Sequence, residues 1–238
     1  MKTSATILHI ALLHETRQAP VCRTGEIVTK SRTCLPVVEC FLGKLQEAGI
    51  ITLTGEEIHV TSEQRMRIAE LAISRGADPE RVATELRWQE FEGLAAHILD
   101  TEGYVTAKHF IFRNSARKYE IDVLGAKEPM VLCVDCKHWH HGWAPSRIVA
   151  AARNQMLRVL CLSEAYAFYG RKLRIAGWRS AQLLPIVLTL ADVSSKMVDG
   201  VPIVSALRLR DFLCQVSPWD ERLRFVDIPV RSQDLLLF

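Results

Sequence analysis

The sequence lacks an apolar run long enough to cross a membrane, although 49% of its 238 residues are hydrophobic. A spanning helix needs about 20 consecutive apolar residues. The first apolar stretch, ILHIALLHE, contains two histidines and ends at Glu15, whereas a secretory signal has a basic start and an unbroken apolar segment. We therefore expect residues 4–15 to form the first helix of a soluble globular protein, a class that the 24% of charged residues also favours.

The sequence also lacks a disulfide framework. Its seven cysteines are odd in number, scattered along the chain and mostly within apolar segments. Free thiols in a reducing cytoplasm are therefore expected. Cys133 and Cys136 have the C-x-x-C spacing of zinc and redox sites. However, positions i and i+3 of a strand point to opposite faces and no second pair completes four ligands, which favours buried thiols.

Nucleotide and nucleophile motifs are missing as well. The chain has no phosphate-cradling P-loop, no G-x-G-x-x-G and no G-x-S-x-G. These absences argue against ATP-driven, dinucleotide-dependent and serine-hydrolase chemistry. The chain also has no internal repeat and no low-complexity tract, so its length predicts one large domain or two small ones.

The net charge is only +3, but the charge is unevenly distributed. Residues 1–87 carry 11 basic and 11 acidic residues, whereas residues 145–180 carry seven basic residues and a single acid. The seven are Arg147, Arg153, Arg158, Arg171, Lys172, Arg174 and Arg179. Such a local surplus predicts a phosphate-binding surface, and a solvated helix face is the alternative.

Residues 1–61 are expected to form a winged-helix domain. Helical patterns at 4–15, 23–30 and 33–48 precede IITLTGEEIHVT, which is typical of two short strands around a Gly-Glu turn. Three helices followed by a hairpin resemble a winged helix, whose third helix enters the major groove when it reads DNA. At this third helical segment the only basic residues are Lys44 and the preceding Arg32, beside Glu39 and Glu47. DNA binding and a dimerisation or partner-docking role therefore remain alternatives.

Residues 62–87 are expected to form a helical connector, and residues 88–238 a second domain. That domain begins with an amphipathic helix, WQEFEGLAAHILDTEG. Strands are expected at 104–112, 118–124, 130–138, 184–190 and 201–206, with helices from 146 and around 207–214. This order predicts an α/β fold with a mixed central sheet.

Charged residues interrupt the most apolar strand segments of this domain. Asp135 and Lys137 lie two apart in MVLCVDCK and therefore project from the same face, while Asp122 lies on the preceding strand, close enough along the chain to pair antiparallel. Glu92, at the border of the apolar helix stripe, is a better third acid than Glu90. Clustered carboxylates beside a lysine suit a Mg²⁺ site that hydrolyses a phosphodiester. A self-neutralising Asp–Lys pair is the alternative.

The pattern Asp122 … Asp135-Cys136-Lys137 resembles the PD-(D/E)XK nuclease superfamily, as do Phe91-Glu92 on a helix and Gly103-Tyr104 at a strand start. The similarity covers residues 88–214 and is nearest to Mrr-like restriction endonucleases and archaeal-type Holliday-junction resolvases. It implies a restriction-endonuclease-like fold and DNA hydrolysis with Mg²⁺, for which Mn²⁺ substitutes. The family's proline is absent before Asp122, and Asp135 replaces the commoner glutamate.

The same resemblance implies a role for each site residue. Asp122 and Asp135 would be metal ligands, with Glu92 as an auxiliary ligand. Lys137 would position the attacking water, and Gln155 on the next helix would orient Lys137 or a phosphate. The predicted DNA contacts are Arg147, Arg153, Arg158, Arg171, Lys172 and Arg174. One site per chain predicts a homodimer if both strands are cut.

Two alternatives stay open at this point. The protein is either this nuclease or a non-catalytic DNA-binding or regulatory protein that retains the nuclease fold. The segment KHWHHGW places His138, His140 and His141 beside the predicted site. They would act as a metal ligand, phosphate contact or general base, or else form a polar loop between Trp139 and Trp143.

Overall fold

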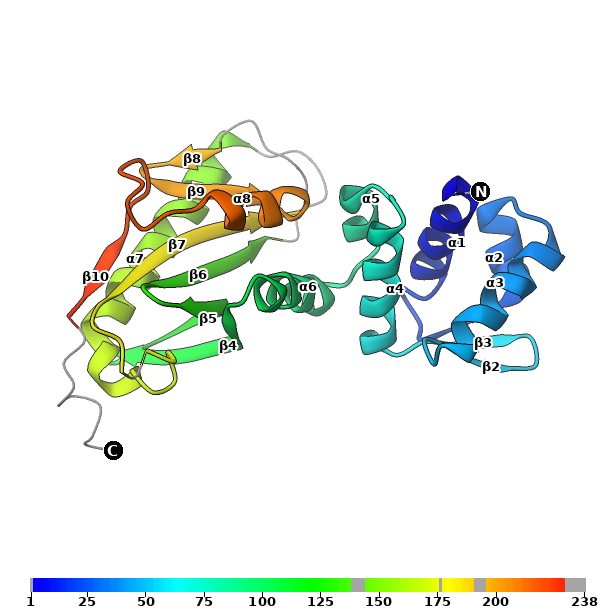
Figure 1. Ribbon diagram of the computed structural model, residues 1–238, viewed down its shortest axis with the longest axis horizontal. Helices are drawn as coiled ribbons and strands as arrows, with labels where there is room; N and C mark the ends of the chain where they lie inside the picture. The colour runs from blue at the N-terminus through cyan, green and yellow to red at the C-terminus, as the bar shows by residue number, and fades with distance from the viewer. Residues whose placement is uncertain (1, 138–143, 176, 191–195, 230–238) are drawn as a thin grey trace. The chain divides into compact units, whose positions relative to one another are not determined.

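The computed structural model divides into two compact units, Met1–Phe91 and Glu92–Phe238. Figure 1 shows the order of the helices and strands along the chain. The structure describes the whole chain except residues 1, 138–143, 176, 191–195 and 230–238. The boundary falls inside helix α6 (Trp88–Thr101), so the first turn of this helix belongs to the first unit.

The first unit combines helices with a small antiparallel sheet. Its elements are α1 (Lys2–Glu15), β1 (Val21–Arg23), α2 (Thr24–Ser31), α3 (Leu35–Glu47), β2 (Thr52–Thr54), β3 (Glu57–His59), α4 (Ser62–Ser74) and α5 (Pro79–Thr84). The strand order is β1–β3–β2. The expected helices and hairpin are present. Strand β1, which pairs Cys22 with Ile58, was not expected, because three residues are too few to show an alternating pattern.

The boundaries of α3 follow from its residue types. Pro36 lies in the first turn, where the missing N–H removes no helical hydrogen bond. Gly49 adopts a left-handed φ of 67°, and the N–H of Ile50 donates to the Leu45 carbonyl at 2.8 Å, which closes the last turn. The helix buries side chains at i, i+4 and i+7 spacing, so one face packs into the unit.

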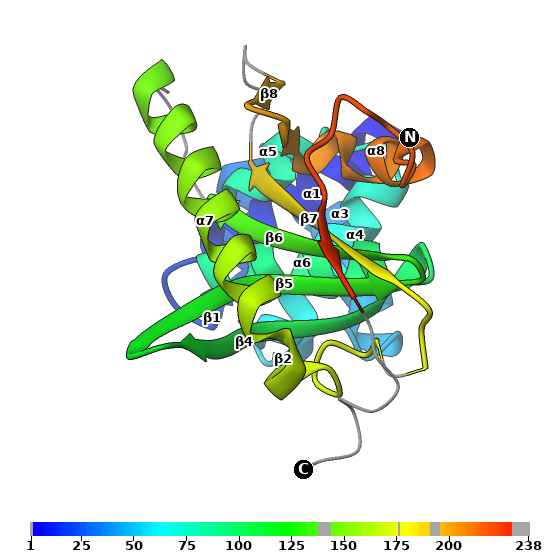
Figure 2. The same cartoon turned by 90° about the vertical axis from the view of Figure 1, so that its left-hand side faces the viewer.

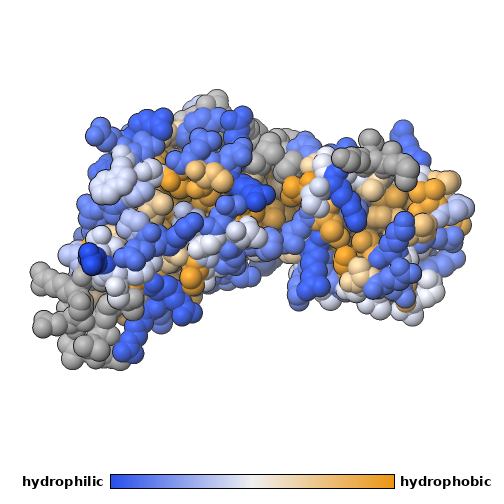
Figure 3. Space-filling model, in the orientation of Figure 1, coloured by the Kyte–Doolittle hydropathy of each residue, from blue (hydrophilic) through white to orange (hydrophobic). Residues whose placement is uncertain are grey.

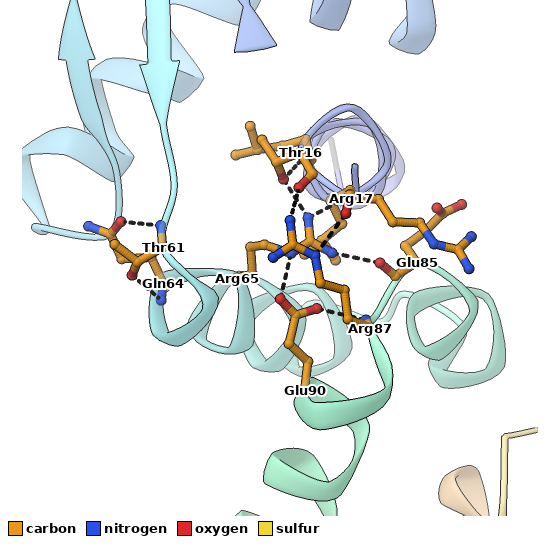
Figure 4. Close-up of polar contacts among 10 residues, drawn as sticks. Thr16, Arg17, Thr61, Gln64, Arg65, Glu85, Arg87 and Glu90 are labelled. Carbon is orange, nitrogen blue, oxygen red and sulfur yellow. Dashed lines mark hydrogen bonds and ion pairs between the residues drawn. The ribbon is translucent and has the colours of Figure 1, made fainter. Parts of the chain in front are cut away.

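The segment expected as a connector, residues 62–87, is part of the first unit's core. Arg65 on α4 is completely buried, and its Nε donates to Glu90 Oε1 at 2.8 Å. Its guanidinium also donates to the backbone carbonyls of Leu13 and Glu85, each at 2.6 Å (Figure 4). These bonds join α4 to α1 and to the first turn of α6. A buried guanidinium is stable only when its N–H groups have acceptors. Since the acceptors of Arg65 come from α1, from residue 85 and from α6, residues 62–87 pack as part of the first unit.

The second unit is built on a mixed seven-stranded sheet with the order β4–β5–β6–β7–β9–β8 and with β10 paired to β7. After α6, its elements are β4 (Val105–Asn114), β5 (Arg117–Lys127), β6 (Met130–Lys137), α7 (Pro145–Tyr169), β7 (Ala181–Thr189), β8 (Met197–Val198), β9 (Val201–Ser205), a 3₁₀ turn (Ala206–Arg208), α8 (Leu209–Gln215) and β10 (Val226–Ile228). The predicted α/β class with a mixed central sheet is therefore confirmed.

Strand β6 forms the centre of this unit. Residues 130–136 are all buried, and the strand pairs antiparallel with β5 and parallel with β7. Helix α7 lies along one face of the sheet and α8 on the other (Figures 1 and 2). Ile148 and Met156 of α7 pack in one apolar cluster with Val187 of β7. Side chains of β6 that point towards α7 are therefore covered by that helix.

The short elements β8 and β10 were not expected from the sequence, and α7 continues for 25 residues. On the face of the molecule drawn in Figure 3, hydrophilic and hydrophobic residues are interspersed. Within the described part of the chain, no helix has the length and apolar character that crossing a membrane requires.

Candidate active site

Asp122 and Asp135 stand opposite each other on neighbouring strands. The β5–β6 register pairs Val123 with Val134, and continuing it by one residue brings the two aspartates together. The N–H of Cys136 donates to Asp122 Oδ2 at 2.8 Å, so the Asp122 side chain lies against β6. The predicted convergence of two acids from adjacent strands is present.

Lys137 projects from the same face as Asp135, as the two-residue spacing predicts. Its Nζ lies 2.8 Å from Asp135 Oδ2 and 3.0 Å from Oδ1. Only 3% of the Asp135 side chain is exposed, against 24% for Lys137. The carboxylate is thus buried while the ammonium reaches solvent.

Helix α7 adds a second cation to Asp135. Nη1 of Arg158 donates to Asp135 Oδ1 at 2.6 Å and to Gln155 Oε1 at 3.2 Å. Gln155 is fully buried and donates from Nε2 to the Cys133 carbonyl at 2.7 Å. Gln155 therefore links Arg158 to β6. Its predicted role, to orient Lys137 or a phosphate, stays a prediction. Arg158, a predicted DNA contact, forms an ion pair with Asp135.

Glu92 is a buried acid without a hydrogen-bond donor. It is fully buried, and neither carboxylate oxygen has a hydrogen-bond partner among the described residues. Burial, and secondarily the negative charge of Asp122, raises the pKa of Glu92 to about 7, while His109 opposes the shift. Glu90, the less favoured acid, is paired with Arg65 in the first unit (Figure 4).

His109 on β4 is a neighbour of the site that the sequence analysis missed. Lys108 pairs with Val123 and Phe110 with Ile121, so His109 stands opposite Asp122. Its Nε2 lies 3.5 Å from Glu92 Oε2 and its Nδ1 3.1 Å from Glu120 Oε1. His109 has a left-handed φ of 52°, which no feature of the strand pattern predicts.

The pKa of Asp122 is also raised, because this side chain is largely buried and lies close to another acid, Asp135. Burial raises the pKa of Asp122, and the charge of Asp135 adds to the increase. The Cys136 N–H, Lys137 and Arg158 oppose it. A carboxylate that is hard to ionise beside another acid is one that a bound cation would stabilise.

The donor chemistry of these acids fits an oxygen-seeking divalent cation. Asp122, Asp135 and Glu92 supply only carboxylate oxygens, which Mg²⁺ prefers, and those of Glu92 are buried and unbonded. Within the described residues, no three His, Cys, Asp or Glu side chains are already grouped so as to hold a metal. Cys133 and Cys136 are free, buried thiols, in agreement with the interpretation of the C-x-x-C spacing.

A pocket of about 260 Å³ gives access to the Asp135–Lys137 pair. It is lined by Asp135, Lys137, Arg147, Ala150, Ala151, Asn154 and Arg158. Arg147, a predicted DNA contact, therefore lines the same pocket as Asp135 and Lys137. Arg153 instead faces Asp199, with its Nε 3.2 Å from Oδ2.

The remaining predicted residues lie elsewhere. Arg171, Lys172 and Arg174 line a different pocket, beside β4. The three histidines of KHWHHGW (His138, His140 and His141), with Trp139 and Trp143, lie outside the described residues.

The fold and this cluster define an α/β protein with a buried acidic site on a mixed sheet. No known family profile matches the sequence. An uncharacterized protein of Archaeoglobus fulgidus is 31% identical over 128 residues, which make up 54% of this chain and 90% of that protein. The chain therefore belongs to the same family as this uncharacterized protein.

Two solved structures are more distantly similar. The crystal structure of AF1548, a protein of unknown function, has a TM-score of 0.33 and 15% identity, covering 48% of this chain and 57% of that one. The crystal structure of protein VC1899 from Vibrio cholerae has a TM-score of 0.40 and 14% identity, covering 92% and 51%. The chain thus spans about half the length of either protein.

Proposed function

We propose that the protein is a metal-dependent DNA endonuclease whose second unit is a restriction-endonuclease-like domain. The observation that carries this proposal is the meeting of Asp122 and Asp135 on neighbouring strands, with Lys137 Nζ 2.8 Å from Asp135. This is the arrangement that the PD-(D/E)XK pattern implies. The order of helix, antiparallel strands, long helix and parallel strand around it supports the same assignment.

In this proposal, Asp122, Asp135 and Glu92 would hold Mg²⁺ or Mn²⁺, which when bound would polarise the phosphodiester and lower the pKa of a bound water. Lys137 orients the attacking water and stabilises the negative charge that develops on the phosphate. Arg158 shares Asp135 with Lys137, and Gln155 fixes the position of Arg158. Burial of the carboxylates keeps bulk water away and strengthens each of these interactions.

For the first unit we propose a winged helix. The order α1, β1, α2, α3, β2, β3 supports it, because the hairpin of β2 and β3 follows the three helices and pairs with β1, which lies between α1 and α2. Its role is DNA docking or dimerisation.

A homodimer would bring two active sites to the two strands of a duplex. Sedimentation equilibrium with and without DNA distinguishes DNA docking from dimerisation.

One observation favours a second candidate function, a non-catalytic DNA-binding or regulatory protein. Both oxygens of Asp135 are contacted by Lys137, and one is also contacted by Arg158. A buried carboxylate that is already neutralised by two cations has less need of a metal. In that case the acidic cluster would serve only to hold α7 against β6.

Incubation with supercoiled plasmid separates the two candidates. The wild type is expected to nick the plasmid with Mg²⁺ and not with EDTA, and Asp122→Asn and Lys137→Met are expected to lose about 100-fold or more of the rate. Asp227→Asn is the matched control, because this exposed side chain contacts only Gln182 among the described residues, and an asparagine there still accepts that hydrogen bond. DNA binding without nicking, in Mg²⁺ and in Mn²⁺ alike, would establish the non-catalytic alternative.

A further inference from the structure

A second pocket of the second unit has only basic residues among its charged and ionisable lining side chains. It measures about 520 Å³ and lies between residues 107–111 of β4 and residues 171–174, which follow α7. Its charged or ionisable lining residues are Lys108, His109, Arg171, Lys172 and Arg174, with no acid among them. We call this feature the basic pocket. Its two walls are 60 residues apart in the sequence, so only the fold brings the cations together.

Four cations of the basic pocket are not held by direct bonds to other charged side chains, although the charge of Lys108 opposes the rise in the pKa of Glu92. Among the described residues, Lys108, Arg171 and Arg174 make no side-chain hydrogen bond or ion pair, and Lys172 contacts only the ring of Tyr169, at 5.9 Å. All four side chains are exposed. Two basic residues of α7 differ, because Arg153 and Arg158 are each paired with an aspartate.

The acids next to the basic pocket, Glu92 and Glu120, contact only His109 among its lining residues. The other four cations repel one another, which disfavours the arrangement unless an anion binds. The backbone on both sides of the basic pocket is also unusual. His109 and Arg174 have left-handed φ values of 52° and 61°, a conformation that costs about 1 kcal/mol or more for a residue with a Cβ. The two strained residues thus lie in the two segments that form the walls of the basic pocket, residues 107–111 and 171–174.

The basic pocket borders the candidate active site through His109. The ring of His109 lines the pocket, and its Nε2 lies 3.5 Å from Glu92 Oε2. The same residue stands opposite Asp122 across the β4–β5 pair. A polyanion held in the basic pocket would therefore lie beside these acids. The pocket that Asp135 lines contains a further cation, Arg147.

We propose that the basic pocket is a subsite for DNA backbone phosphates that flank the phosphate to be cleaved. This inference rests on the proposed nuclease function for the choice of DNA as the polyanion. Exposed cations with no acid among them suit phosphates of any sequence, because no buried hydrogen-bonding group is available to read a base. The subsite therefore contributes affinity and position, and no sequence preference.

The test compares two triple variants of the full chain with equal loss of charge. Lys108→Gln/Arg171→Gln/Lys172→Gln removes three cations of the basic pocket. Arg117→Gln/Lys118→Gln/Arg224→Gln removes three exposed cations of the same unit that lie outside it, of which Arg117 lies over a tyrosine ring as Lys172 does. Binding of a fluorescent duplex is measured by anisotropy in EDTA, so that no cleavage occurs, over a series of salt concentrations. Thermal unfolding of each variant checks the fold.

The pocket variant is expected to bind about tenfold or more weakly near 0.1 M salt, with a log–log salt slope shallower by about 2–3, because each lost phosphate contact removes roughly 0.9 from the slope. The control variant should change affinity by about twofold at most. Equal losses in the two variants, or no DNA binding by the wild type, would overturn the subsite. A parallel titration with inorganic phosphate at matched ionic strength separates the sources. Phosphate binding that the pocket variant abolishes, without any effect on DNA affinity, would also overturn it.

Failure of the subsite and failure of the nuclease proposal give different results. If the wild type nicks plasmid with Mg²⁺ while the pocket variant binds and cleaves normally, only the subsite is wrong. If the pocket variant loses DNA affinity selectively while the wild type never nicks, the subsite stands and the hydrolase proposal fails. A single-stranded oligonucleotide of equal length shows whether one strand is sufficient to fill the pocket.

Discussion

Asp122 and Asp135 face each other across two neighbouring strands, yet among the described residues only Asp135 forms ion pairs, with Lys137 and Arg158. Asp122 accepts a single backbone hydrogen bond, from Cys136. The two acids are therefore not equivalent. Asp122 is the carboxylate that is more available to a new cation, and Asp135 is the one whose charge is already balanced.

This asymmetry makes Asp122 the sharper probe of metal binding. At about 100 times its dissociation constant, Mg²⁺ should stabilise the wild type by about 2.7 kcal/mol, or raise its Tm by about 5–10 °C. Asp122→Asn should lose most of this shift, because the neutral amide is a poor Mg²⁺ ligand. Differential scanning calorimetry with and without Mg²⁺ measures both. An undiminished shift in Asp122→Asn, with Asp227→Asn as control, would contradict a site at Asp122.

Arg158 should compete with a metal for Asp135. Its Nη1 lies 2.6 Å from Asp135 Oδ1, so a divalent cation at that oxygen meets a like charge. Arg158→Met is therefore expected to bind Mg²⁺ about tenfold more tightly, equivalent to about 1.4 kcal/mol, while unfolding more easily. Isothermal titration calorimetry gives the affinity. Arg153→Met, which removes a cation paired with exposed Asp199, should leave it unchanged, and weaker binding in Arg158→Met would refute the competition.

Arg65 should be the most sensitive charged residue of the first unit. Arg65→Met leaves Glu90 buried beside no cation, and we expect a loss of about 3–5 kcal/mol in the free energy of unfolding. Urea denaturation provides the measurement. Arg67→Met on the same helix is the control, since its pair with Glu63 at 3.4 Å is exposed and worth about 0.5 kcal/mol or less.

The double variant Arg65→Met/Glu90→Met tests the cause of that loss. Removing both charges should restore part of the stability, because no buried charge is then left unpaired. If the double variant is less stable than Arg65→Met, the backbone hydrogen bonds of the guanidinium matter more than the ion pair.

Stability of the first unit should fall at acidic pH because of His9. This histidine is fully buried, its Nδ1 lies 2.5 Å from the Ala5 carbonyl, and Arg75 Nη1 lies 2.8 Å from its Nε2. Nε2 must therefore be the unprotonated nitrogen that accepts from Arg75. Burial, and to a smaller extent the Arg75 charge, lowers the pKa of His9 below its usual 6.5.

The sign of the pH effect follows from proton binding. The folded state binds fewer protons at His9 than the unfolded chain, so stability is fully present above pH 6.5 and is lost as the pH falls below it. His9→Gln should flatten this decline in urea titrations between about pH 7 and pH 5. His59→Gln, at a half-buried position whose side chain is 42% exposed, should retain the wild-type slope. A steep decline in His9→Gln would assign the effect to another group.

The local pattern of the chain was enough to predict much of the fold. Alternation in MVLCVDCK predicts that Asp135 and Lys137 share a face, and strand pairing of near neighbours predicts that Asp122 joins them. Helix periodicity and Gly49 predict α3 and its end. The short strands β1, β8 and β10 could not be predicted, because two or three residues carry no periodic signal and form only where a partner strand lies beside them.

The sequence by itself determined which residues alternate, where helices end and which acids fall inside apolar strands, because these depend on covalent spacing and backbone geometry. Only the tertiary structure decided which side chains share a partner. Gln155 bonds to Arg158 rather than to Lys137, Arg158 turns to Asp135 rather than to solvent, and His109 meets Glu92. Such contacts depend on how a helix packs over a sheet, and residues distant along the chain compete there for the same few buried oxygens.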